Sequence, residues 1–118
     1  MRTMMIVATL LSIVLGTAAA QAHAHLDHAS PQVGSTVPTA PSEVSLWFTQ
    51  NLEPAFSTVE VFDATDARVD QGKAQISANI MRIGLKALAP GSYKVRWHAV
   101  SVDTHVTEGS FTFNVGGS

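Results

Sequence analysis

The chain has 118 residues, with nine acidic and seven basic side chains and no cysteine. This length suffices for one domain with a modest core and is too short for two. The small excess of acidic residues argues against nucleic acid or an anionic membrane as a partner. The lack of cysteine excludes disulfides, thiolate metal sites and thiol nucleophiles, so any chemistry must rest on imidazole, carboxylate and backbone groups.

The first 22 residues have the pattern of a cleaved signal peptide. Arg2 supplies a positive charge, an apolar run covers residues 4–16, and Ala20 and Ala22 offer small side chains before a cut. The apolar run is shorter than the ~20 residues that a membrane-spanning helix needs. We therefore expect residues 1–22 to be removed and residues 23–118 to form a soluble, exported domain.

Short runs of alternating apolar and polar residues recur through the rest of the chain, separated by proline, glycine and other turn residues. The run at residues 43–49, for example, places Val44, Leu46 and Phe48 on one face. The expected strands cover residues 26–30, 43–49, 57–63, 69–76, 79–85, 92–100 and 109–115. Seven short strands without a helical segment predict an all-β fold, an immunoglobulin-like Greek-key sandwich or barrel.

The expected cut changes the chemistry of one histidine. Cleavage after Ala22 makes His23 the first residue, so its α-amine and its ring nitrogen can chelate a single metal ion. The reference pKa of an α-amine is roughly 7.7–8.0, so a metal ion easily displaces its proton at neutral pH. His25 lies two residues further on, and it either adds a ligand or enters the first strand.

A carboxylate and an imidazole two residues apart precede the last strand. If residues 101–109 are extended, Asp103 and His105 point to the same side and Thr104 points away. With His23 they would supply three nitrogen donors and one oxygen donor, a set that suits copper(II) best, with zinc as the competitor. The alternative is structural, with Asp103 capping a turn and His105 solvated.

The remaining candidates have simpler explanations. His98 alternates with the expected core residue Trp97 and falls on the outward face of its strand, and His28 is expected to be solvated. After signal cleavage Met81 is the one methionine left, and the strand pattern buries it. Because copper(I) prefers several thioether or thiolate ligands, any bound copper should be copper(II).

Several stretches of the chain resemble the CopC family of periplasmic copper-resistance and copper-uptake proteins. They are HAHL at residues 23–26, LWFTQNLEPAFS at 46–57, PGSYKVRWHAVSVDTH at 90–105 and GSFTFNV at 109–115. The most specific is the pattern W-x-A-V-S-x-D-x-H. The resemblance implies a seven-stranded Greek-key β domain in the periplasm that binds copper(II) through His23, Asp103 and His105, with the role of His25 left open.

The chain departs from the family pattern at two points. It lacks the methionine-rich insertion that forms a copper(I) site in some relatives, which matches the copper(II)-only type. Gln50 stands where relatives often have an acidic residue near the copper, so an amide replaces a carboxylate that would orient a ligand.

The resemblance and the expected ligands favour a copper(II) carrier or buffer in copper homeostasis and resistance, and not an enzyme. Such a carrier would deliver the ion to a CopD-like inner-membrane transporter. Two alternatives stay open. A histidine brace built on His23 would make the protein a copper oxidoreductase, although the small size and the lack of an evident substrate surface oppose this. A chain with no metal role would be a structural immunoglobulin-like domain.

Overall fold

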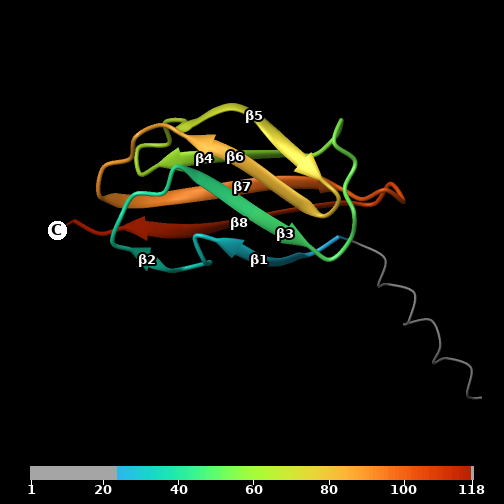
Figure 1. Ribbon diagram of the computed structural model, residues 1–118, viewed down its shortest axis with the longest axis horizontal. Coiled ribbons are helices and arrows are strands. Elements are labelled where there is room, and N and C mark those ends of the chain that lie inside the picture. The colour runs from blue at the N-terminus through green and yellow to red at the C-terminus, as the bar shows by residue number, and fades with distance from the viewer. Residues whose placement is uncertain (1–23, 118) are drawn as a thin grey trace, which may run out of the picture.

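The computed structural model describes residues 24–117, so the expected signal peptide and His23 lie outside the described residues. Eight strands make up this part of the chain (Figure 1). They are β1 Leu26–Ser30, β2 Thr36–Val37, β3 Glu43–Phe48, β4 Thr58–Asp63, β5 Asp70–Ser77, β6 Ile80–Leu85, β7 Gly91–Val100 and β8 Val106–Val115. No helix that could cross a membrane occurs among residues 24–117.

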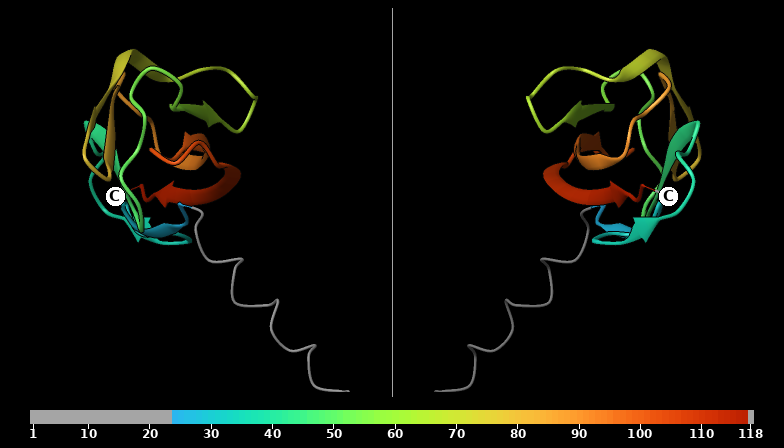
Figure 2. Two further views of the ribbon diagram at one scale, coloured as in Figure 1. Left: turned by 90° about the vertical axis from the view of Figure 1, so that its right-hand side faces the viewer. Right: turned by 90° about the vertical axis from the view of Figure 1, so that its left-hand side faces the viewer.

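The strands form two four-stranded sheets that face each other. One sheet has the order β1-β3-β6-β5 and the other the order β2-β8-β7-β4. Figure 2, which looks along the long axis, shows the two sheets as separate layers. The predicted all-β sandwich is therefore confirmed, and each of the seven expected strands is present within a few residues.

The eighth strand, β2, was not expected from the sequence. It has two residues and pairs in parallel with the end of β8. Two residues are too few to show an alternating pattern, so the sequence gives no periodic signal for this strand. Hydrogen bonds from Gly34 N to Thr112 O (2.7 Å) and from Asn114 N to Ser35 O (2.8 Å) hold its connection against β8.

The core lies between the sheets, where the alternation of each strand places its apolar side chains. On β7 the side chains of Val95, Trp97 and Ala99 are buried, as predicted, whereas the residues between them face outward. Gly109 lies directly across from Trp97 on β8. A Cβ atom at position 109 would lie 2.5 Å from Cζ2 of Trp97, so glycine leaves the space that the indole occupies.

The two ends of the sandwich carry different segments, which we call the loop end and the turn end. The loop end comprises residues 24–25, 49–57 and 101–105, and the turn end comprises residues 63–70 and 89–91. On β4 Thr58 pairs with His98 and Asp63 pairs with Tyr93, so these two sets of segments lie at opposite ends of β7. At about 3.3 Å per residue, ten residues of β7 separate them by roughly 30 Å. In Figure 1 the loop end lies on the right and the turn end on the left.

Candidate metal centre at the loop end

Three segments that are distant in sequence meet at the loop end. Ala24 is fully buried, and its carbonyl oxygen accepts a hydrogen bond from Thr107 Oγ1 at 2.6 Å. His25 N–H donates to Thr49 Oγ1, and Thr49 N–H donates to His25 O, both at 2.9 Å. Val102 N–H donates to Asn51 O at 3.0 Å. The first described residues are thus attached to the segment before β4 and to the start of β8.

The structure brings Asp103 and His105 together. His105 Nδ1 lies 3.3 Å from Asp103 Oδ1, and the two side chains are 48% and 43% exposed. Ser101 is fully buried, and its hydroxyl donates to the same Asp103 oxygen. The hydrogen bond from Ser101 lowers the pKa of Asp103, and the contacts with His105 lower it further, although partial burial opposes both. Asp103 is therefore an ionised, accessible carboxylate at neutral pH.

The backbone between Ser101 and His105 is a tight turn, so the expected extended conformation was wrong. Thr104 N–H donates to Ser101 O at 2.8 Å, and Thr104 has a φ of +72°, in the left-handed region. Ser101 N–H in turn donates to His105 O at 3.0 Å, which closes the loop. The side chains of Asp103 and His105 converge because the chain folds back on itself, and not because they share one face of a strand.

The other predicted site residues have different positions. His23 lies outside the described residues, so the structure does not test its predicted role. His25 is exposed, and its side chain does not join Asp103 and His105: within residues 24–117 no three histidine, cysteine, aspartate or glutamate side chains gather as a metal site would require. The residues on either side of Gln50 bond to the other two segments of the loop end. Thr49 bonds to His25, and Asn51 O accepts from Val102 N–H.

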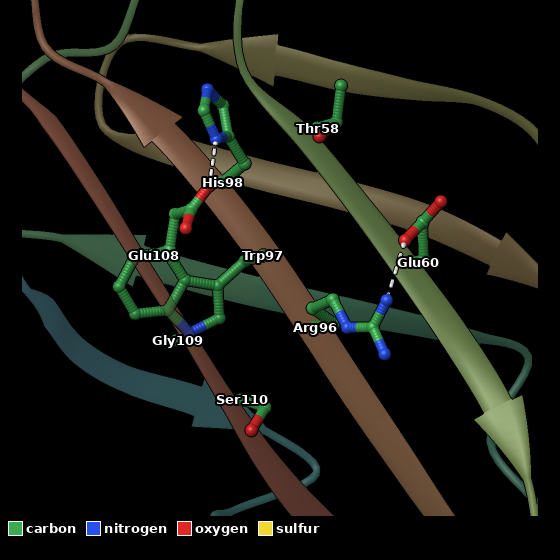
Figure 3. A pocket seen from close by; sticks show the side chains of 8 residues that line it. All are labelled: Thr58, Glu60, Arg96, Trp97, His98, Glu108, Gly109 and Ser110. Atoms are coloured by element: carbon green, nitrogen blue, oxygen red, sulfur yellow. Dashed lines mark hydrogen bonds and ion pairs between the residues drawn. The ribbon is translucent and has the colours of Figure 1, made fainter.

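Two further histidines interact with neighbouring side chains. His28 stacks on Trp47 with ring centroids 4.5 Å apart, and its Nδ1 lies 2.7 Å from Asp27 Oδ2. His98 lies on the outward face, as predicted, and its Nδ1 is 2.8 Å from Glu108 Oε2. Figure 3 shows the His98–Glu108 pair at one side of a shallow groove of about 280 Å³ on the outer face of the β4-β7-β8 sheet.

Sequence reasoning missed three residues that organise the loop end. Ser101 positions Asp103, Thr107 holds Ala24, and Thr49 holds His25. Ser101 belongs to the S-x-D-x-H pattern, so a search for hydroxyl groups within hydrogen-bond reach of Asp103 could have found it. The contact between Thr107 and Ala24 joins residues 83 positions apart, and no local signal marks it.

These features define a class: a small β-sandwich that presents a carboxylate and an imidazole at one end, beside the first described residues of its chain. The sequence model of the CopC domain matches residues 26–116. The chain therefore belongs to the CopC family, and membership of this family implies that it binds copper.

Individual proteins support the assignment. The chain is 34% identical over 110 residues to protein YobA of Escherichia coli (strain K12), covering 90% of this chain and 89% of YobA. It is 33% identical over 111 residues to copper resistance protein C of Pseudomonas syringae pv. tomato, covering 86% and 87% of the two chains. The crystal structure of CopC from Methylosinus trichosporium OB3b superposes with a TM-score of 0.71 at 33% identity, covering 80% of this chain and 94% of that one.

A further relative is much longer than this chain. The copper transport protein CutJ of Bacillus subtilis is 33% identical over 99 residues, which cover 80% of this chain and 18% of CutJ. The same type of domain therefore occurs as a small part of a larger copper transport chain. Two of these relatives are named as copper proteins, one for copper resistance and one for copper transport.

Proposed function

We propose that the chain, once cut after Ala22, is a periplasmic copper(II) carrier or buffer whose ion is held by His23, Asp103 and His105. His23 contributes its α-amine and a ring nitrogen, His105 contributes a ring nitrogen and Asp103 contributes an oxygen. The copper ion is cargo, which the protein holds and passes to a CopD-like transporter in the inner membrane. The names of its relatives support a role in copper resistance and transport.

One observation carries this proposal: the hydrogen bond from Thr107 Oγ1 to Ala24 O. Consecutive Cα atoms are about 3.8 Å apart, so a chain that begins at His23 begins within one residue of this bond. Thr107 is in turn two residues from His105. Folding would then bring the new terminus to the loop before copper arrives, which lowers the entropic cost of assembling the site.

The donor set explains the preference for copper(II). Three nitrogen donors and one carboxylate oxygen suit a tetragonal copper(II) site, and copper(II) exceeds zinc in the affinity order of divalent ions. Ser101 and His105 both contact Oδ1 of Asp103, so we assign Oδ2 to the ion. Amine and imidazoles must lose their protons to bind, so affinity should fall as the pH is lowered from about 8 to about 5.

The proposal is tested by changing the terminus alone. Copper(II) is titrated into protein that begins at His23 and into protein that carries one additional alanine before His23, with the visible absorption of bound copper(II) as the readout. The extension removes the six-membered chelate ring that the amine and Nδ1 of His23 close with the ion, because the free amine now belongs to the alanine. We expect the dissociation constant to rise at least about 100-fold, as two donor atoms are disrupted at once.

Equal affinity of the two forms would contradict the proposal. A second comparison keeps the result interpretable: protein that begins at His23 and carries His28→Ala, a change at a histidine remote from Asp103 in the sequence, should bind copper(II) as the native chain does. If both the extended form and the His28→Ala form lose affinity, the ion sits near β1 and not at the loop end.

A further inference from the structure

Two threonines hold opposite sides of one peptide group at the start of the described chain. This group joins Ala24 to His25. Its carbonyl oxygen accepts a hydrogen bond from Thr107 Oγ1 at 2.6 Å, and its N–H donates to Thr49 Oγ1 at 2.9 Å. Thr107 belongs to β8 and Thr49 follows β3, so side chains from both sheets fix the same peptide group.

The first three residues of the cut chain offer copper(II) a second way to bind. These residues would be His23, Ala24 and His25. A histidine at the third position allows the α-amine, the next two backbone nitrogens and the third residue's ring to form fused chelate rings around one ion. Four nitrogen atoms in a plane suit copper(II). A terminus that was free in solution could therefore hold the ion without Asp103 or His105, in what we call the backbone chelate.

The hydrogen bonds of the folded chain oppose the backbone chelate. A backbone nitrogen binds copper(II) only after it gives up its hydrogen, because ligand atoms must be deprotonated. The hydrogen on His25 N is donated to Thr49 Oγ1, so binding of the ion there would break this bond. The bond from Thr107 fixes the orientation of the same peptide group. Ala24 is fully buried, so its nitrogen is closed to an ion that arrives from solvent.

We propose that Thr49 and Thr107 determine how this protein coordinates copper(II), by keeping the backbone nitrogens of Ala24 and His25 out of the site. This inference rests on the proposed function, because it concerns the terminus that begins at His23. The two threonines are positioning residues, since they act on the ion through the peptide group. Their hydrogen bonds leave the amine and the ring of His23 to be completed by Asp103 and His105.

The test compares the visible absorption of bound copper(II) in variants of the chain that begins at His23. The double valine variant, Thr49→Val with Thr107→Val, removes both hydroxyls and keeps the branched shape. The double serine variant, Thr49→Ser with Thr107→Ser, keeps both hydroxyls. Thr112→Val is the matched control, because it makes the same substitution at an exposed residue of β8. The amidated tripeptide His-Ala-His gives the reference spectrum of the backbone chelate.

Each variant is first shown to be folded by its urea unfolding curve, because an unfolded chain would form the backbone chelate whatever its threonines do. If the double valine variant does not fold, Thr49→Val and Thr107→Val are measured singly, since each removes one of the two hydrogen bonds.

The proposal predicts that the folded double valine variant shows the absorption band of the tripeptide, at a shorter wavelength than the native band. Deprotonated backbone nitrogens cause this shift because they exert a strong ligand field. The double serine variant and Thr112→Val should keep the native band. Adding Asp103→Ala and His105→Ala should lower copper(II) affinity less than about threefold in the double valine variant, against at least about 1,000-fold in the native chain.

A native band in the folded double valine variant overturns the proposal, and so does the tripeptide band in the native chain. The proposed function fails by a different result: native affinity that does not change when Asp103 and His105 are replaced.

Discussion

The loop end and the turn end both contain aspartates with lowered pKa values, but these aspartates are held in different ways. At the turn end Asp63 accepts hydrogen bonds from Thr65 N, Thr65 Oγ1 and Ala67 N, all within 3.0 Å. Those hydrogen bonds, first the one from the Thr65 side chain, lower its pKa. At the loop end the partners of Asp103 Oδ1 are two side chains, the Ser101 hydroxyl and the His105 imidazole, whereas Asp63 Oδ1 also accepts from two backbone N–H groups.

Asp70, also at the turn end, differs from Asp103 in both its burial and its hydrogen-bond partners. Burial alone would raise its pKa, but two hydrogen bonds from the Arg68 guanidinium, one from Val61 N–H and the charge of Arg68 outweigh burial and lower it. Its side chain is 5% exposed, against 43% for Asp103. A buried carboxylate such as Asp70, which accepts hydrogen bonds through both oxygens, stabilises the fold. A carboxylate that is ionised, half exposed and only partly satisfied is available to an ion.

The largest effect is expected from removing both ligands at the loop end. The double variant Asp103→Ala, His105→Ala should lose copper(II) affinity by at least about 1,000-fold, since loss of a group that merely orients a ligand already costs about 10–100-fold. The urea midpoint should change little, because both side chains are about half exposed. Copper titration and urea unfolding of the same preparation check both parts, and retained affinity would rule out these two ligands.

The opposite pattern is expected at the turn end. Asp70→Ala leaves Val61 N–H and the Arg68 guanidinium without their acceptor, which should lower the free energy of unfolding by about 2–4 kcal/mol. Copper(II) affinity should stay within about twofold, because Asp70 accepts hydrogen bonds from Val61 and Arg68, and neither belongs to the turn that carries Asp103 and His105. If Asp70→Ala lowered copper(II) affinity by much more than twofold, the fold at the turn end and copper binding at the loop end would not be independent.

Features that depend on residues close together in the sequence were predicted better than features that depend on residues far apart. The strands and the buried faces follow from alternation, which is local, so β7 and its core side chains Val95 and Trp97 were predicted correctly. The convergence of Asp103 and His105 was predicted, but from the wrong backbone conformation, since the left-handed Thr104 carries no sequence signal. The contact of Thr107 with Ala24 depends on the finished fold and could not be predicted.

The packing of Trp97 in the core should depend on Gly109. Gly109→Ala would place a methyl group against the buried indole of Trp97, and we expect a loss of about 1–3 kcal/mol in the free energy of unfolding. The control is Gly84→Ala on β6, where the nearest atom lies 3.5 Å from the added Cβ and the change should be small. Urea unfolding of the two variants measures the difference, and equal stability would contradict the packing described for Trp97.

The pH dependence of stability should come from the turn end. The pKa of Asp70 is lower in the folded protein than its unfolded value of about 3.9, so its contribution is present above that value and is lost as the pH falls through the folded pKa. The difference in unfolding free energy between the native chain and Asp70→Asn should therefore shrink between about pH 5 and about pH 2. A difference that stays constant over this range would show that the ionised carboxylate does not stabilise the fold.

The smallest effect is expected from Ser101→Ala. Loss of its hydroxyl removes the hydrogen bond that positions Asp103, and copper(II) affinity should fall about 10-fold, the lower end of the range for groups that orient a ligand. Ser101→Thr keeps a hydroxyl and should restore part of the affinity if the buried site accommodates the added methyl group. Unchanged affinity in Ser101→Ala would mean that the turn alone positions Asp103.

The central claim, that copper(II) binds where the new terminus meets the loop before β8, is tested most directly by paramagnetic broadening. Copper(II) at a small fraction of one equivalent is added to ¹⁵N-labelled protein that begins at His23, and the amide signals are followed. We predict selective loss of the signals of Ala24, Asp103 and His105, while Thr65 and Ala67 at the turn end stay sharp. Broadening centred on Asp27 and His28, or spread evenly over both ends, would contradict the account.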